Sequence, residues 1–201
     1  MFVINGPIGY DEENGGTLAK PFIDQLKEQS GDIEIAINSN GGIVSEGVEI
    51  YNALMAYEGK VTVRINVMAA SIASVIAMAA DHVIIDSNAQ MMIHKAWTVA
   101  AGNSDELKQV AVILDQLDGG IADVYAERTG IDKEELLALM GKEFYMTAAE
   151  AVKLGFADEI NVIKRDRSKN TEATPEASQG NLSWATALAR ASVIVRNTKE
   201  V

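Results

Sequence analysis

The sequence contains 201 residues, of which 48% are hydrophobic and 23% are charged, and this length suits a single globular domain with a sizeable core. Its formal net charge of −12 argues against nucleic acid and anionic membrane surfaces as partners, because both require clustered Lys and Arg side chains. The sequence has no cysteine, which excludes a disulfide framework, a thiol nucleophile and a thiolate metal site.

The N-terminal third of the chain alternates predicted strands and helices. Residues 2–4 form a short apolar run that predicts a strand, and a helix capped by Thr17 is predicted over residues 17–29. Alternating isoleucines predict a second strand over residues 32–38, which is followed by a predicted helix over 45–57. Such alternation is typical of a parallel α/β unit with right-handed crossovers.

The most apolar stretch follows a third predicted strand at residues 61–67. Residues 67–80 are small and apolar, with no Gly or Pro, and predict a buried helix, so Ser71 lies where a strand leads into a helix. A hydroxyl at this junction lies beside free backbone N–H groups and the positive end of the helix dipole. That position suits a nucleophile whose reaction develops an oxyanion. The alternative is a serine that only caps the helix.

Two short strands, residues 82–86 and 91–95, and then a long helix are predicted next. The helix runs from Asn103 to Arg128, with Asn103 and Glu106 forming a capping box and Gly130 in a C-terminal cap position. A helix of this length spans roughly 39 Å, which is longer than a compact domain of this size readily covers. Its apolar stripe is therefore buried either against another subunit or in an ordinary core.

The last third of the chain contains two short predicted helices, residues 131–141 and 147–154, and a strand-like segment at 156–162. From Lys164 the composition becomes polar and cannot form a core. We therefore expect a folded domain over residues 1–163 and a linker and tail over 164–201 that are mobile or dependent on a partner. The N-terminus lacks a signal-peptide pattern and no apolar run is long enough to span a membrane, so we expect a soluble, cytoplasmic protein.

The two histidines narrow the choice of a base for Ser71. A serine hydroxyl needs a nearby base to act as a nucleophile at neutral pH, and histidine is the usual one. His94 lies inside a predicted apolar strand that a polar turn follows, which makes it the better candidate, although a structural role also fits. His82, next to Asp81, is explained by a surface turn.

Other residues fit an acyl-transfer site. The backbone N–H of Ile72 and that of the Gly41-Gly42 pair could supply the two oxyanion donors, since a missing Cβ lets the backbone approach a ligand closely. A plain turn also explains the two glycines. Glu143 is one of several carboxylates that could orient the base, or it is a solvated surface charge.

Four segments of the sequence stand out as a set: Asn38-Ser-Asn-Gly-Gly42, Met68-Ala-Ala-Ser-Ile-Ala-Ser74, Met91-Met-Ile-His-Lys95 and Phe144-Tyr-Met-Thr-Ala-Ala-Glu-Ala-Val-Lys-Leu-Gly-Phe-Ala-Asp158. They resemble, in the same order, segments of the proteolytic subunit of the Clp protease. The resemblance covers roughly residues 1–162. It implies a crotonase-like ββα spiral with a protruding handle helix, and subunits that form seven-membered rings stacked face to face as a homo-oligomer.

The resemblance also implies roles for individual residues. Ser71 corresponds to the nucleophile and His94 to the general base. Glu143 falls where the family usually carries the triad Asp. Gly42 and Ile72 correspond to the oxyanion hole, and the Gly41-Gly42 pair lies beside the extended substrate.

The chain departs from the family pattern in several places. Asn40 stands where the family usually has Pro, and Glu143 is one methylene longer than the usual Asp. The chain starts almost directly with its first predicted strand, so we expect it to lack most of the segment that engages an unfoldase ring, which counts against an ATPase partner. Together with the tail, these departures resemble the Clp-related head-maturation proteases of phages and prophages.

The sequence thus favours a serine endopeptidase that cleaves polypeptides through an acyl-enzyme, without a metal or other cofactor. The alternatives are a general protein-degrading Clp-type peptidase working with an ATPase, a coenzyme-A-dependent crotonase-fold enzyme, and an inactive structural ring. A Ser-Lys dyad is disfavoured because Lys95 points to the opposite strand face from His94.

Overall fold

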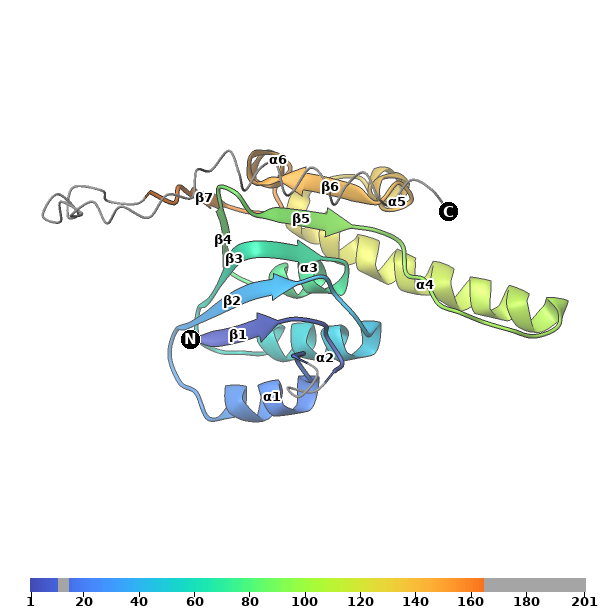
Figure 1. Ribbon diagram of the computed structural model, residues 1–201, viewed down its shortest axis with the longest axis horizontal. Helices are drawn as coiled ribbons and strands as arrows, with labels where there is room; N and C mark the ends of the chain where they lie inside the picture. The colour runs from blue at the N-terminus through green and yellow to red at the C-terminus, as the bar shows by residue number, and fades with distance from the viewer. Residues whose placement is uncertain (11–14, 165–201) are drawn as a thin grey trace, which may run out of the picture. The chain divides into compact units, whose positions relative to one another are not determined.

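The computed structural model describes residues 1–10 and 15–164, so the predicted tail beyond Lys164 lies outside the described residues. The predicted alternation of strands and helices is confirmed (Figure 1). The strands are β1 (Phe2–Asn5), β2 (Ile33–Ser39), β3 (Val61–Ala70), β4 (His82–Asp86), β5 (Gln90–Ile93), β6 (Phe144–Thr147) and β7 (Glu159–Asn161). The helices are α1 (Ala19–Lys27), α2 (Val44–Met55), α3 (Ile72–Ala77), α4 (Ser104–Thr129), α5 (Lys133–Met140) and α6 (Ala148–Lys153).

Within the described residues the seven strands form one sheet, which divides at β3. The main order is β1-β2-β3-β4-β7, and all of these pairings are parallel, as the α/β pattern predicts. The N-terminal half of β3 pairs with β4, whereas its C-terminal end pairs with β5 through Met68 to Ala70. β5 in turn pairs antiparallel with β6. The division places the end of β3 beside the end of β5.

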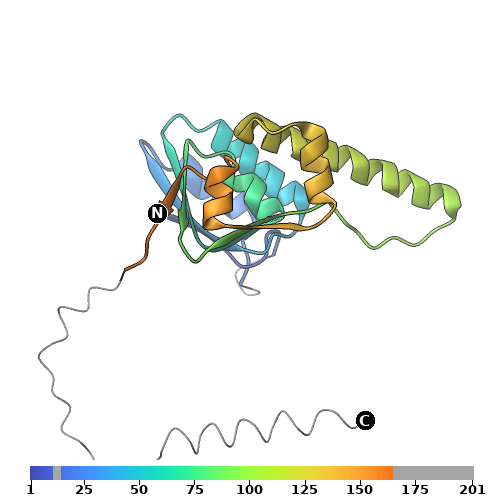
Figure 2. The same ribbon diagram turned by 90° about the horizontal axis from the view of Figure 1, so that it is seen from above.

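The core lies between the sheet and the helices packed on it. In β2 the alternating residues Ile33, Ile35 and Ile37 are buried, as the period of two predicts. Every residue of α3 is buried, because this short apolar helix contacts α2, α4 and the strands β2, β3 and β5. Figures 1 and 2 show α2, α3 and the C-terminal part of α4 on the same side of the sheet.

The long helix α4 has the ends that the sequence predicts. The Asn103 side chain accepts hydrogen bonds from the backbone N–H groups of Asp105 and Glu106, and the Glu106 carboxylate accepts from Asn103 N–H. Gly130 closes the helix in a left-handed conformation. The buried residues of α4 begin at Asp118, and the N-terminal half projects away from the sheet (Figures 1 and 2).

The prediction that Thr17 caps the first helix is wrong. The Thr17 hydroxyl instead lies 3.3 Å from both the N–H and the carbonyl oxygen of Asn5. α1 begins two residues later, and its Ala19 N–H donates to the Glu46 carboxylate at 2.7 Å. A residue 27 positions away in sequence therefore satisfies this helix end, which a local capping rule could not predict.

Three further differences concern strand and helix lengths. The helix expected over residues 67–80 is shorter, because β3 continues to Ala70 where β5 provides a partner. The predicted last strand shortens to β7. The sequence pattern did not predict β6, a four-residue strand formed by pairing with β5. Tertiary pairing decides all three, as is usual for short strands. No helix within the described residues is long and apolar enough to cross a membrane.

Candidate active site

The end of β3 brings Ser71 next to His94. Ala70 pairs with Met92 in the parallel register, and the Ser71 N–H donates to the Met92 carbonyl at 2.9 Å. His94 follows β5 directly, and its Nε2 lies 2.7 Å from Ser71 Oγ. This distance is that of a hydrogen bond, in which an unprotonated Nε2 would accept the serine proton. Two residues chosen from sequence patterns thus form one hydroxyl–imidazole pair.

The backbone of Ser71 is in a conformation that only glycine adopts easily. Its φ is 54° and its ψ is −131°. Such a conformation costs on the order of 1–3 kcal/mol and persists only where the surrounding structure holds it. Ser71 occupies the N-cap position of α3, but its side chain makes no capping bond, which argues against the alternative that this serine only caps the helix. The hydroxyl is instead turned toward His94.

The glycine pair after β2 lies against Ser71. A Cβ on Gly41 would lie 2.7 Å from Ser71 Cβ and 3.2 Å from Ser71 Oγ, and a Cβ on Gly42 would overlap the carbonyl oxygen of Ile8. Only glycine therefore allows this approach. The buried Ser39 hydroxyl fixes the turn, because it accepts the Gly41 N–H at 3.1 Å and donates to the Gly6 carbonyl at 2.6 Å.

Two backbone N–H groups are the expected oxyanion donors, and each belongs to a residue that follows one placed at the site: Ile72 follows Ser71, and Gly42 follows Gly41. Ile72 is the first residue of α3, where N–H groups precede the helical ladder. Among the backbone hydrogen bonds of turns and loops in residues 1–10 and 15–164, none is donated by the Gly42 N–H. Donors placed in this way can hold a developing oxyanion.

Glu143 lies in the turn before β6 and is exposed, with a left-handed backbone at φ 50°. In the described part of the chain, no hydrogen bond or ion pair joins His94 to Glu143 or to another carboxylate. Catalytic hydrogen bonds are often long in the absence of substrate, so the missing bond does not exclude Glu143 from the site. The role of Glu143 stays a prediction.

A buried carboxylate that the sequence pattern did not single out binds the segment just after His94. Asp118 of α4 is 3% exposed, and its Oδ1 accepts the Ala96 N–H at 2.7 Å. Its Oδ2 lies 3.7 Å from Lys95 Nζ, so the lysine side chain is held by α4 and not by Ser71. The signal was present in the sequence, because Asp118 interrupts the apolar stripe of the long helix between Leu114 and Ile121.

The second histidine belongs to a different part of the sheet. His82 begins β4 opposite Thr62, about nine strand residues before Ser71, which corresponds to roughly 30 Å. Its ring lies 3.3 Å from Glu159 and 3.6 Å from Asp158. Among the described residues, no cluster of three or more His, Asp or Glu side chains could hold a metal ion.

Comparison with known proteins agrees with the resemblance of the sequence segments. Residues 8–164 match the Clp protease family. The chain belongs to the Clp protease family. The matched range includes Ser71, His94 and Glu143.

A relative within the family is the ATP-dependent Clp protease proteolytic subunit of Deinococcus radiodurans. The two sequences are 30% identical over 131 residues, which cover 64% of this chain and 64% of that protein. The chain thus aligns with somewhat less than two thirds of the length of this curated relative.

Proposed function

We propose that this chain is a serine endopeptidase that hydrolyses peptide bonds through an acyl-enzyme. The observation that carries the proposal is the 2.7 Å distance between Ser71 Oγ and His94 Nε2, next to a glycine turn and a helix N-terminus. Membership of the Clp protease family supports the same chemistry. In this proposal residues 1–163 are the catalytic domain, folded as the crotonase-like ββα spiral of the family.

The proposed reaction uses each of these groups in turn. His94 Nε2 takes the proton of Ser71 Oγ while Oγ attacks the scissile carbonyl carbon. The N–H groups of Gly42 and Ile72 donate to the resulting oxyanion, and loss of one such donor typically costs about 10²–10³ in turnover. His94 then gives the proton to the leaving amine as the C–N bond breaks. A water molecule, deprotonated by His94, hydrolyses the ester and frees Ser71.

Glu143 is the proposed acid of the triad. It would accept a hydrogen bond from His94 Nδ1 and stabilise the imidazolium that forms during the attack. Its position in a short turn of left-handed backbone supports the proposal, since such backbone is costly for a residue other than glycine and is enriched at functional sites. Contact with substrate or with a second subunit would bring the carboxylate into bonding distance.

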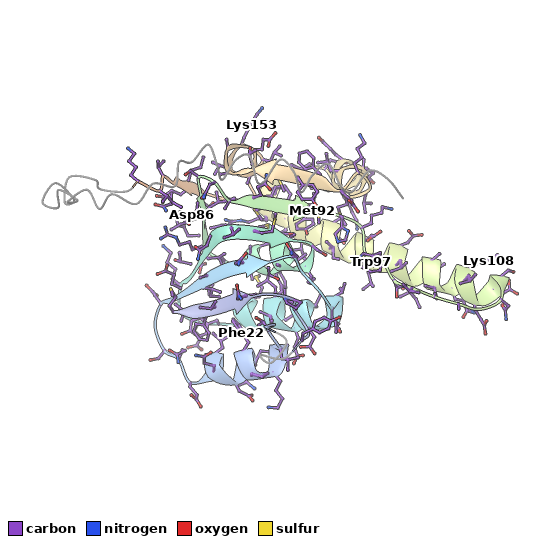
Figure 3. The ribbon with its side chains drawn as sticks, viewed as in Figure 1. Phe22, Asp86, Met92, Trp97, Lys108 and Lys153 are labelled. Carbon is purple, nitrogen blue, oxygen red and sulfur yellow. The ribbon has the colours of Figure 1, made fainter. Side chains whose placement is uncertain are left out.

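We propose that the chain works as a homo-oligomeric ring and that α4 forms part of the contact. Figure 3 labels Trp97 near the base of α4 and Lys108 near its far end, and apolar side chains are exposed between them. A concentration of large exposed apolar side chains on one projecting element supports an interface there. The exposed apolar residues of α4 and the preceding segment are Trp97, Val99, Leu107, Val112, Ile113 and Leu117.

The oligomer is tested by the mass of the particle in solution. Ile113→Asp places a charge on α4 at a site that is 55% exposed, and we expect a smaller particle. Val162→Asp is the matched control, because Val162 is 58% exposed but lies beyond β7. An Ile113→Asp particle of unchanged mass would count against α4 as the contact.

The substrate is a polypeptide, and the proposed subtype is a head-maturation protease of the phage and prophage type. Glu143 in place of the usual Asp and the polar residues that follow the matched range support this subtype. The relative is named as ATP-dependent. We propose that short peptides are cleaved here without an ATPase, because they are already extended and need no unfolding.

The function is tested by hydrolysis of a denatured, casein-like protein and of short fluorogenic peptides, with and without ATP. Wild type should cleave both, and Ser71→Ala should cleave neither. Cleavage by Ser71→Ala at the wild-type rate would reject the mechanism. A few defined cuts in a scaffold or capsid protein would support the maturation subtype, whereas complete degradation of casein would favour general proteolysis.

A further inference from the structure

A buried hydroxyl pair lies directly beneath the nucleophile. Ser74, which is fully buried in α3, has its Oγ 2.6 Å from the carbonyl oxygen of Ser71 and 2.8 Å from the hydroxyl of Tyr125. Tyr125 comes from the C-terminal half of α4, 51 residues further along the chain, and is 1% exposed. Neither hydroxyl takes part in the mechanism described above.

The direction of these hydrogen bonds follows from the number of protons. The neighbours of Ser74 Oγ include two carbonyl oxygens, those of Ser71 and Met92 (at 3.3 Å), and these can only accept. Ser74 therefore donates its single proton to a carbonyl, and the shorter distance selects Ser71. Tyr125 must then donate to Ser74 Oγ. Burial raises the pKa of the Tyr125 hydroxyl, so this donor keeps its proton throughout the neutral range.

The Ser71 carbonyl also accepts the Ser74 backbone N–H at 2.9 Å, so two donors converge on one oxygen. This oxygen belongs to the peptide group that joins Ser71 to Ile72. In a planar trans peptide the C=O and the N–H point in opposite directions. Holding the Ser71 oxygen in the interior therefore aims the Ile72 N–H outward, toward the side where the oxyanion forms.

The backbone conformation makes such a restraint necessary. Ser71 is in a region of φ and ψ that is unfavourable for a residue with a side chain, so the peptide group would relax without opposing contacts. Tyr125 is itself held by packing, because its ring lies 5.4 Å from the ring of Phe156. A fixed tyrosine thus orients a fixed serine.

We propose that Ser74 and Tyr125 are positioning residues that orient the Ile72 N–H for the oxyanion hole. The proposal rests on the proposed function for its catalytic consequence. It requires Ser71 to be the nucleophile and Ile72 to be an oxyanion donor. Neither hydroxyl touches the substrate, so both act only through the peptide group after Ser71.

The test compares Tyr125→Phe, Ser74→Ala and the double variant with wild type in peptide hydrolysis. Tyr125→Phe removes one hydroxyl without changing the ring, and we expect kcat to fall about three- to twentyfold with KM unchanged within about twofold. Ser74→Ala should lower kcat further, roughly ten- to one-hundredfold, which approaches the loss of a whole donor. Tyr57→Phe is the matched control, because its hydroxyl donates to the Gly31 carbonyl at the opposite end of the sheet.

The double variant separates catalysis from stability. Ser74→Ala leaves the Tyr125 hydroxyl buried without a partner and lowers the melting temperature, whereas removal of both hydroxyls restores part of that loss. If the pair acts through the Ile72 N–H, kcat of the double variant stays at the level of Ser74→Ala while its melting temperature recovers. If kcat recovers together with the melting temperature, the effect is only structural and the proposal is overturned.

Amide hydrogen exchange of residues 71–75 distinguishes failure of this proposal from failure of the proposed function. Faster exchange in Tyr125→Phe supports the restraint on the peptide group, even if wild type hydrolyses no peptide and the proposed function is wrong. Active wild-type enzyme whose kcat and exchange are unchanged by Tyr125→Phe would overturn the proposal and leave the proposed function intact.

Discussion

Gly41→Ala is the substitution whose consequences follow most directly from the geometry of the site. The new methyl group would lie 2.7 Å from Ser71 Cβ and 2.8 Å from the carbonyl oxygen of Ala70. Ordinary carbon contacts are 3.5–4.0 Å, so the glycine turn or Ser71 must move by roughly 1 Å. The φ of 94° at Gly41 is also unfavourable for alanine.

A displacement of about 1 Å at a catalytic group can cost on the order of 10²-fold in rate, and separation of the Gly42 N–H from the oxyanion costs about 10²–10³. We therefore expect kcat/KM of Gly41→Ala to fall by about two to three orders of magnitude in peptide hydrolysis. Gly31→Ala is the matched control, because Gly31 also has a positive φ of 78° but no atom lies within 4 Å of the added Cβ. It should lose roughly 1–2 kcal/mol of stability and keep its activity.

Urea denaturation measured beside the kinetics separates the two effects. Both variants carry the backbone penalty, and only Gly41→Ala disturbs the nucleophile. Retention of activity by a folded Gly41→Ala enzyme within about threefold of wild type would refute the close approach of the glycine turn to Ser71. Equal losses of activity in Gly31→Ala would show that backbone strain alone explains the result.

Substitutions at three residues test separate parts of the account. Glu143→Gln should lower kcat by about 10²-fold or more without changing the melting temperature. Glu127→Gln, at another exposed glutamate, is the control. If the two variants lose the same amount of kcat, Glu143 is not part of the triad. Asp118→Ala should lower the free energy of unfolding by roughly 1–3 kcal/mol and lower kcat. Asp118→Asn keeps an oxygen that accepts the Ala96 N–H, so its stability and kcat should stay close to those of wild type. Equal losses in Asp118→Ala and Asp118→Asn would contradict the contact with Ala96. Burial raises the pKa of Tyr125 above its usual 10.0, so the unfolded state releases that proton first and the free energy of unfolding falls as the pH rises above about 10. Tyr125→Phe should make this fall less steep. An unchanged slope in Tyr125→Phe would contradict a raised pKa at Tyr125.

The parts of the fold that could be predicted depend on residues close together in the sequence. The ends of α4 follow from Asn103, Glu106 and Gly130, which act within one turn of the helix termini. The position of Ser71 between a strand and a helix follows from one continuous apolar stretch. These signals are local, and the structure agrees with them closely.

The parts that could not be predicted depend on contacts between distant residues. Glu46 satisfies the start of α1 from a neighbouring helix, and β6 exists because β5 offers it an edge. The hydrogen bond between Ser74 and Tyr125 joins two residues that each look unremarkable in an apolar helix. In the site, the sequence could suggest that Ser71 and His94 meet, but the division of β3 between two partners is what brings them together.

The central claim is that His94 activates Ser71. The most direct measurement is the rate at which a fluorophosphonate probe modifies the protein, with the modified residue identified by mass spectrometry. The account predicts a single adduct on Ser71 in wild type and a loss of labelling by orders of magnitude in His94→Ala. An adduct on another residue, or equally fast labelling of Ser71 in His94→Ala, would contradict it.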